Sequence, residues 1–194
     1  MVIGSEPVAD LAQWIRGRAG IVSIDADFFT DPQEQRLLPH LRTWLMNEGA
    51  EAPIVFRTEH VDLIDMVRRP VEFLINFDFH MDCRVEFLHG DPPKRPPCSA
   101  SVFETLLGDG LIERYIWAFP AVRRAVAAQV FSSGVITGRQ PLLSRIHCVE
   151  GRDVLGLLTG VEVEGVFVCR SPSYATATTN AIYDDLRSMA LTAS

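Results

Sequence analysis

Short apolar runs alternate with stretches of helical periodicity through the first half of the chain. Residues 21–24, 53–56 and 71–75 are mostly apolar runs of the kind that forms buried strands. Between them, apolar residues recur at the spacing of a helix face in residues 31–49 and 61–69. Strands that alternate with helices in this way indicate parallel βαβ units. The pattern therefore predicts an α/β fold of three layers, α/β/α, with a mostly parallel sheet.

Similar patterns continue to the end of the chain. The remaining elements expected are a first helix that begins at Ser5 and ends at Gly17 and Gly20, helices at residues 102–107, 121–130 and 179–191, and β-rich pieces at residues 114–119, 142–149, 154–158 and 161–169. The last three β-rich pieces form either an antiparallel flank or the last strands of the sheet.

Length and charge narrow the class of protein. With 194 residues, 47% of them hydrophobic, the chain suits one compact domain that spans residues 1–194. Its net charge of -7 argues against binding to nucleic acid, because duplex-binding proteins normally present a basic face to the phosphates. An acidic protein attracts cations instead.

The start of the chain and its cysteines indicate the compartment. The first residues lack the basic flank and apolar core of a signal peptide, and no apolar run approaches the roughly 20 residues needed to cross a bilayer. The four cysteines are widely spaced and contain no CxxC pair, which suits reduced thiols. We therefore expect a cytoplasmic protein that does not bind membranes.

Acidic and histidine side chains follow two of the apolar runs at alternate positions. Asp78, His80 and Asp82 come after the run at residues 71–75, and Asp25 and Asp27 end the run at residues 21–24. If each strand stays extended, side chains two residues apart face the same way. This spacing is typical of metal ligands.

His60 follows the third apolar run, so all six side chains are expected where parallel strands end. The carboxyl ends of the strands in an open parallel sheet form its ligand-binding edge. Four or more carboxylates gathered there would repel one another unless cations lay between them. Oxygen and imidazole donors suit manganese ahead of iron or zinc. Two such ions can activate a shared water molecule, which makes hydrolysis the expected chemistry.

These motifs resemble those of a known enzyme superfamily. Asp78, His80 and Asp82 match the Asp-x-His-x-Asp signature of the arginase, agmatinase and ureohydrolase superfamily, and residues 23–32 resemble its Asp-x-Asp segment that ends in Asp-Pro. His60 matches a further histidine of these enzymes. The two motifs stand here in the reverse order, which a circular permutation would explain. This order is similar to that of an arginase-like family that includes the peptide arginases.

The resemblance implies an arginase-like fold with permuted strand order and a site for two manganese ions. Asp78 and Asp25 would bridge the ions, His60 and Asp82 would complete one shell, and His80 and Asp27 the other. The implied reaction converts arginine residues of a ribosomally made precursor peptide to ornithine and releases urea. Candidate catalytic residues are His89 as proton shuttle and Glu150 or Glu86 as the acid that holds the guanidinium group. The sequence leaves the oligomeric state open, with a homodimer as one alternative.

Two other functions stay open. A haloacid-dehalogenase-like phosphatase also has Asp-x-Asp after its first strand, but it needs Thr or Val where Phe29 stands and a late acidic pair at a strand end. The pair Asp184 and Asp185 is expected in a helix instead. The second alternative is a metal-binding or peptide-binding module without catalysis. The proline-rich residues 91–97 and the stretch at 170–174 could each border a cleft or form ordinary turns.

Overall fold

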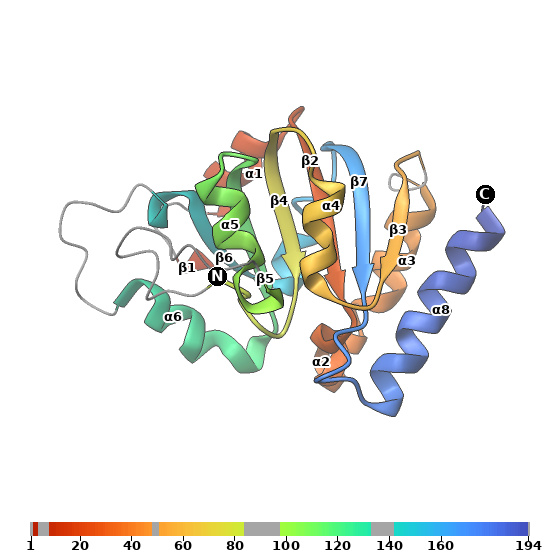
Figure 1. The fold of residues 1–194 in the computed structure, drawn as a ribbon. Coiled ribbons are helices and arrows are strands. Elements are labelled where there is room, and N and C mark those ends of the chain that lie inside the picture. The colour runs from red at the N-terminus through yellow and green to blue at the C-terminus, as the bar shows by residue number, and fades with distance from the viewer. Residues whose placement is uncertain (1, 4–7, 48–50, 84–97, 133–141, 194) are drawn as a thin grey trace.

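The fold is a single twisted sheet with helices on both faces (Figure 1). The computed structural model describes residues 2–3, 8–47, 51–83, 98–132 and 142–193. Within these residues the sheet has seven strands, of which all but the first run parallel. In spatial order the strands are β1 (Val2–Ile3), β6 (Ile146–Glu150), β5 (Ile112–Phe119), β4 (Val71–Phe77), β2 (Ala19–Asp25), β7 (Glu162–Cys169) and β3 (Ile54–Arg57). The α/β/α prediction is therefore confirmed.

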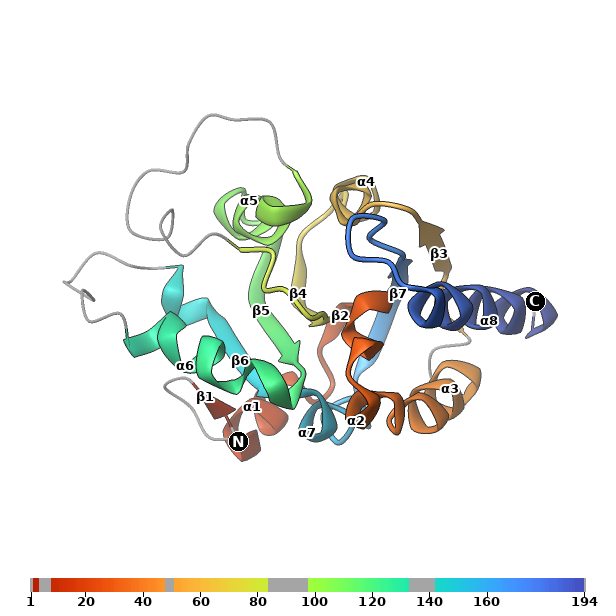
Figure 2. The ribbon, with the colours of Figure 1, turned by 90° about the horizontal axis from the view of Figure 1, so that it is seen from below.

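Helices cover the sheet on two sides (Figure 2). The described α-helices are α1 (Val8–Ile15), α2 (Pro32–Gln35), α3 (Leu38–Asn47), α4 (Leu63–Met66), α5 (Val102–Gly108), α6 (Arg124–Ser132), α7 (Gly151–Val154) and α8 (Ala177–Ala193). The short 3-10 helices that matter here are η1 (Ala26–Thr30) and η2 (His60–Asp62). Helices α4 and α5 pack on one face of the sheet, and α1, α3 and α8 pack on the other.

Alternation along the strands divides the buried side chains into two layers. Val22 and Ile24 of β2 join the cluster beneath α1, α3 and α8, while Ile21 faces α4 and α5. Gly20 precedes them, and a Cβ there would lie 2.4 Å from the ring of Phe73 on the neighbouring strand. Gly20 was expected to end the first helix, but it belongs to β2. Gly17, which has φ 67°, lies in the turn that follows the helix, two residues after its last residue Ile15.

The structure departs from the sequence-based prediction in three elements. The helix expected at residues 31–49 is divided into α2 and α3, because Pro39 cannot continue a helix from the preceding turn. The helix expected at residues 61–69 ends at Met66, shortly before Pro70. Residues 154–158 are not a strand: α7 and a turn bury Val154 and Leu158 in the core with helical spacing.

The last two strands belong to the parallel sheet. β6 and β7 fall in the stretches expected to be β-rich. β6 runs parallel to β5 and pairs antiparallel only with the two-residue strand β1, and β7 runs parallel to both β2 and β3. β7 lies between β2 and β3, so its carboxyl end lies beside the carboxyl ends of these two strands. The antiparallel-flank alternative is therefore wrong for these two strands. In the described residues, no helix combines the length and the apolar character needed to cross a membrane.

Candidate metal centre

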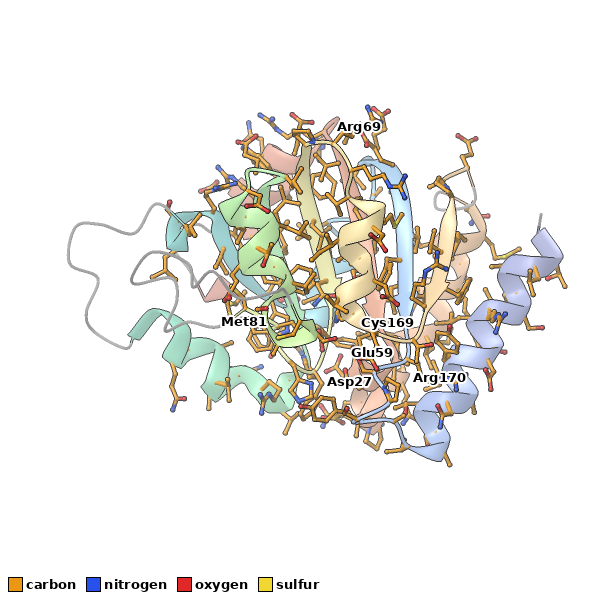
Figure 3. All side chains as sticks on the ribbon, in the orientation of Figure 1. Asp27, Glu59, Arg69, Met81, Cys169 and Arg170 are labelled. Atoms are coloured by element: carbon orange, nitrogen blue, oxygen red, sulfur yellow. The ribbon has the colours of Figure 1, made fainter. Side chains whose placement is uncertain are left out.

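The carboxyl ends of four neighbouring strands bring the motif residues together. Strands β4, β2, β7 and β3 are adjacent and parallel, and they end at the lower edge of the sheet in Figure 1. Figure 3 shows Asp27, Glu59 and Cys169 near this edge, whereas Arg69 lies at the opposite end of the strands. This is the edge at which open parallel sheets bind ligands.

The imidazole of His60 is fully buried, and its Nδ1 atom faces three carboxylates. Nδ1 lies 2.9 Å from Asp82 Oδ2, 3.3 Å from Asp78 Oδ2 and 3.5 Å from Asp25 Oδ2. Despite these distances, Nδ1 has no hydrogen bond of acceptable geometry among the described residues. A buried polar atom without a partner needs an explanation. A cation held between this nitrogen and the three oxygens would satisfy all four atoms. We call these four residues the His60 cluster.

The position of the His60 ring is set by its other nitrogen and by two aromatic rings. Nε2 lies 2.8 Å from Ser23 Oγ in a hydrogen bond. The ring stacks over Phe167 at an interplanar angle of 2° and meets the edge of Phe103 at 87°. Because Nε2 is paired with a hydroxyl, Nδ1 is left to face the carboxylates, as metal-binding histidines require.

Asp27, Asp78 and His80 form a second group, which we call the His80 cluster. His80 Nδ1 lies 2.9 Å from Asp27 Oδ2 and 4.0 Å from Asp78 Oδ1. The ligand atoms of the three side chains all lie within 4.8 Å of one another. The backbone N–H groups of Phe79 and His80 donate to Asp27 Oδ1 and Asp78 Oδ1, at 3.2 and 2.8 Å. Asp78 therefore presents one carboxylate oxygen to each cluster.

Asp78 is buried and firmly held at the end of β4. Asn76 donates from Nδ2 to Asp78 Oδ2 at 3.0 Å, and Trp117 donates from Nε1 to the main-chain oxygen of Asp78 at 2.9 Å. Burial raises the pKa of this carboxyl well above its ordinary value, and the charges of Asp82 and Asp27 raise it further. A divalent cation would relieve this electrostatic strain.

The chain turns after β4 and does not stay extended, contrary to the prediction from alternate positions. Phe77 is the last residue of the strand, and Asp82 has φ 47°, in the left-handed region. Tyr115 fixes the turn by donating its hydroxyl hydrogen to the main-chain oxygen of Met81 at 2.6 Å. His80 consequently enters one cluster and Asp82 the other. A turn, and not a shared strand face, brings the Asp-x-His-x-Asp residues together.

Asp25 ends β2 and is only 1% exposed. Its carboxylate accepts hydrogen bonds from the hydroxyl of Ser171 and, at 3.2 Å, from the N–H of Asp27. Burial and the charge of Asp27 raise the pKa of Asp25 to about 6, although His60 opposes the shift. The charged form of Asp25 is thus costly unless a cation compensates it.

A cleft of about 320 Å³ opens beside both clusters. It is lined by Asp25, His80 and Asp82 from the clusters, and by Glu59, Ser99, Ser171, Ser173 and Tyr174 among the residues around them. Tyr174 is 56% exposed, and its ring centroid lies 4.1 Å from that of His80. The stretch at residues 170–174 therefore lines the cleft, as one of its two interpretations expected.

Of the candidate catalytic residues, the structure describes only Glu150, and it lies apart from the predicted ligands. His89, Glu86 and the proline-rich residues 91–97 lie outside the described residues. Glu150 is buried at the end of β6, which is separated from β4 by β5. Its carboxylate accepts hydrogen bonds from Arg124 Nε at 2.9 Å and from Arg152 at 2.8 Å. Glu150 is thus engaged by two arginines of its own chain and is a member of neither cluster.

Sequence reasoning missed three polar side chains that belong to the site. Ser23 and Asn76 support His60 and Asp78, and each stands two residues before an aspartate ligand in an apolar strand. Alternation places such a residue on the same face as the aspartate, so this signal was present. Cys169 is the third: it ends β7, and its sulfur lies with ligand atoms of Asp25 and His60 inside 4.8 Å.

All six predicted ligands meet at one edge of the sheet, and these buried aspartate and histidine groups could hold a metal ion. A bound cation would offset the cost of burying several carboxylates together. No protein-family model matches this chain, and neither does any curated protein. The site therefore rests on its own geometry.

Proposed function

We propose that this protein is a manganese-dependent hydrolase of guanidino groups that converts arginine residues of a ribosomally made precursor peptide to ornithine. The observation that carries the proposal is the shared carboxylate of Asp78. Its Oδ2 lies 3.3 Å from His60 Nδ1 and its Oδ1 lies 4.0 Å from His80 Nδ1. One carboxylate between two imidazoles, each accompanied by a further aspartate, is an arrangement suited to a pair of divalent ions.

The donor set favours manganese. The six predicted ligands supply carboxylate oxygens and imidazole nitrogens, which suit hard or borderline divalent cations. When bound, two such ions would lower the pKa of a water molecule between them and so supply hydroxide near neutral pH. Asp25 and Asp78 would hold the ions together, with His60 and Asp82 on one side and His80 and Asp27 on the other.

The cleft offers the groups that a guanidinium substrate needs. Glu59 is exposed at its border, and its carboxylate accepts a hydrogen bond from the Ser99 hydroxyl at 3.4 Å. A guanidinium group donates to a carboxylate in a bidentate manner, so Glu59 would bind the cationic end of the substrate. The exposed ring of Tyr174 offers a face for the same cation. Glu59 replaces Glu150 as our candidate for guanidinium binding.

The remaining chemistry is a balanced hydrolysis. Water adds to the guanidinium carbon, the bond from that carbon to the side-chain nitrogen breaks, and the nitrogen takes up a proton to leave as the ornithine amine. Urea carries away the carbon with its other two nitrogens. His89 stays a prediction for the proton donor. An open cleft suits a peptide substrate, whose arginine can enter from outside.

The alternatives fit the site less well. Asp184 and Asp185 lie in α8, where they pair with Arg170 and Arg42. A phosphatase of the haloacid-dehalogenase type would need such an acidic pair at a strand end. A purely structural metal site would be closed to solvent, whereas the cleft here reaches both clusters.

Metal analysis combined with a peptide assay tests the proposal. Elemental analysis of protein loaded with manganese should find two ions per chain. Arginine-containing peptides incubated with this protein should lose one CN2H2 unit per converted arginine by mass spectrometry, with an equal amount of urea. The Asp78→Asn variant is the control, because it removes the shared carboxylate, and it should give neither product.

Two results would overturn the proposal. Protein that binds two manganese ions but converts neither peptidyl arginine, free arginine nor agmatine would have another substrate class. Conversion that continues in Asp78→Asn protein with its full metal content would show that the shared carboxylate does not organise the site.

A further inference from the structure

The thiol of Cys169 lies against the His60 cluster and has no part in the function proposed above. Cys169 is the last residue of β7 and is fully buried. It stands in register with Asp25 on the adjacent parallel strand, so the two side chains leave the same face of the sheet. Its sulfur, a ligand oxygen of Asp25 and a ring nitrogen of His60 all lie within 4.8 Å of one another.

Packing holds the sulfur in this place. Phe167 lies two residues earlier on β7 and supports the His60 ring by stacking, so β7 positions both the ring and the thiol beside it. The Ser171 hydroxyl, which donates to Asp25, lies 3.9 Å from the Cys169 sulfur. The thiol therefore lies beside side chains that contact His60 and Asp25 of the His60 cluster.

A second observation indicates that a ligand belongs at this place. His60 Nδ1 is completely buried and has no hydrogen-bond partner among the residues that the structure describes. It is surrounded by the carboxylates of the cluster, and Cys169 adds a fourth anionic donor once its proton is lost. Nitrogen, oxygen and sulfur atoms that converge on one point are typical of a site for a borderline divalent cation.

We propose that Cys169 is a thiolate ligand of the ion bound by the His60 cluster. The two metal positions then differ: the His60 position has nitrogen, oxygen and sulfur donors, and the His80 position has nitrogen and oxygen donors. The inference rests on the proposed function only for the presence of a second ion. When the cation binds, the thiol proton is released to solvent and the sulfur electron pair forms the bond to the metal.

Ion selectivity is the consequence. A thiolate favours zinc, cobalt or iron over manganese, whereas carboxylates suit manganese. The His60 position would accordingly prefer a softer ion than the His80 position. Protein offered both kinds of ion would then bind an unlike pair, and loss of the sulfur would make the two positions more alike.

Cobalt spectroscopy of the full chain tests the assignment without reference to turnover. Metal-free protein titrated with Co²⁺ should develop a sulfur-to-cobalt charge-transfer band in the near ultraviolet, together with the visible bands of bound cobalt. Cys169→Ala should lose the charge-transfer band and keep the visible bands. Cys148→Ala is the matched control, because Cys148 is equally buried but lies on β6. This control should keep both kinds of band.

Each outcome decides the matter. A charge-transfer band in wild-type protein that disappears only in Cys169→Ala supports the assignment, even if no peptide is hydrolysed and the proposed function fails. A band that persists in Cys169→Ala, or visible cobalt bands without any charge-transfer band in wild-type protein, overturns it. Absence of all cobalt bands overturns both the assignment and the metal site. If Cys169→Ala does not fold, X-ray absorption of the cobalt-loaded wild-type protein replaces the comparison and should find a sulfur atom at about 2.3 Å from the metal. Absence of this sulfur atom refutes the proposal.

Discussion

Ser23 Oγ lies 2.8 Å from His60 Nε2, and this hydrogen bond determines which nitrogen of the imidazole faces the carboxylates. Ser23 is a fully buried polar residue within the apolar strand β2, two residues before the ligand Asp25. Strand alternation places both side chains on the same face of the sheet, where η2 brings His60 across them. The sheet thus supplies one of the proposed metal ligands and the group that orients another.

Replacing Ser23 by alanine should weaken metal binding while leaving the fold intact. Without the hydroxyl, the His60 ring loses the partner that fixes its orientation. Loss of such a supporting partner typically weakens metal affinity about 10- to 100-fold. Isothermal titration of metal-free protein with Mn²⁺ measures the change. Unaltered affinity in folded Ser23→Ala protein would show that aromatic packing alone orients the ring.

Asp78→Asn should have opposite effects on stability with and without metal. The charge of this buried carboxylate adds to the repulsion within both clusters, so the metal-free variant should be at least as stable as metal-free wild-type protein. Manganese at a hundred times its dissociation constant should stabilise wild-type protein by about 2.7 kcal/mol for each bound ion and the variant far less. Thermal unfolding with and without Mn²⁺ measures both differences.

A variant that gains as much stability from manganese as wild-type protein would contradict this account of Asp78. Asp184→Asn serves as the control, because Asp184 is an exposed residue of α8 outside the clusters. It should respond to manganese as wild-type protein does.

The strand ends could be predicted from the sequence, and the path of the chain beyond them could not. Buried parallel strands are continuous apolar runs, so the ends of β2 and β4 and their aspartates are visible in the pattern. The turn after Phe77 depends on the Tyr115 hydroxyl, which comes from the neighbouring strand. Contacts between residues so far apart in the chain leave no local periodicity.

The same reasoning explains why the sequence did not single out Cys169 and why it predicted residues 154–158 to be β-rich. Cys169 stands at the end of an expected strand, but a cysteine there is also an ordinary small core residue. Its role depends on the placement of β7 beside β2, and pairing order is not contained in the local pattern. In residues 154–158, the apolar positions fit one helical turn as well as a strand, because so short a run cannot distinguish the two periods.

Tyr174→Ala should weaken substrate binding without changing metal binding. The exposed ring lies over His80 at the border of the cleft, with ring centroids 4.1 Å apart. A cation over the face of an exposed aromatic ring contributes roughly 0.5 to 1 kcal/mol, so KM for an arginine-containing peptide should rise by about 2- to 5-fold. Tyr174→Phe keeps the ring and should behave as wild-type protein. An equal loss in both variants would instead assign the effect to the hydroxyl.

Glu150→Gln should affect stability and leave metal affinity unchanged. The buried carboxylate is paired with Arg124 and Arg152, and hydrogen bonds to charged groups contribute about 1.5 to 3 kcal/mol. We expect the free energy of unfolding, measured by chemical denaturation, to fall by this amount or less. Glu162→Gln, an exposed change on β7, is the control. A large rise in KM with unchanged stability would restore Glu150 as a substrate-binding residue.

Metal-free protein should lose stability as the pH rises from about 4 to 6. The pKa of Asp25 is raised from 3.8 to about 6 by burial and by the charge of Asp27. Between these values the folded state keeps a proton that the unfolded state has released, so increasing pH favours unfolding. This pKa shift corresponds to a loss on the order of 3 kcal/mol in the free energy of unfolding. The loss is complete once the pH exceeds the folded-state pKa of Asp25.

Metal should reverse the sign of this pH dependence. Cations need the deprotonated carboxylate, so binding becomes stronger as protons leave, and stability at saturating Mn²⁺ should rise over the same range. The Asp25→Asn variant has no titrating group at this position, so its stability without metal should depend less on pH. The exposed change Asp184→Asn is the control and should leave the pH dependence unchanged. Denaturant unfolding at several pH values with and without Mn²⁺ gives all of these curves. A rise in the stability of metal-free wild-type protein between pH 4 and 6 would mean that the buried carboxyl of Asp25 is charged without a cation. The principal electrostatic argument for a metal at this edge of the sheet would then fail.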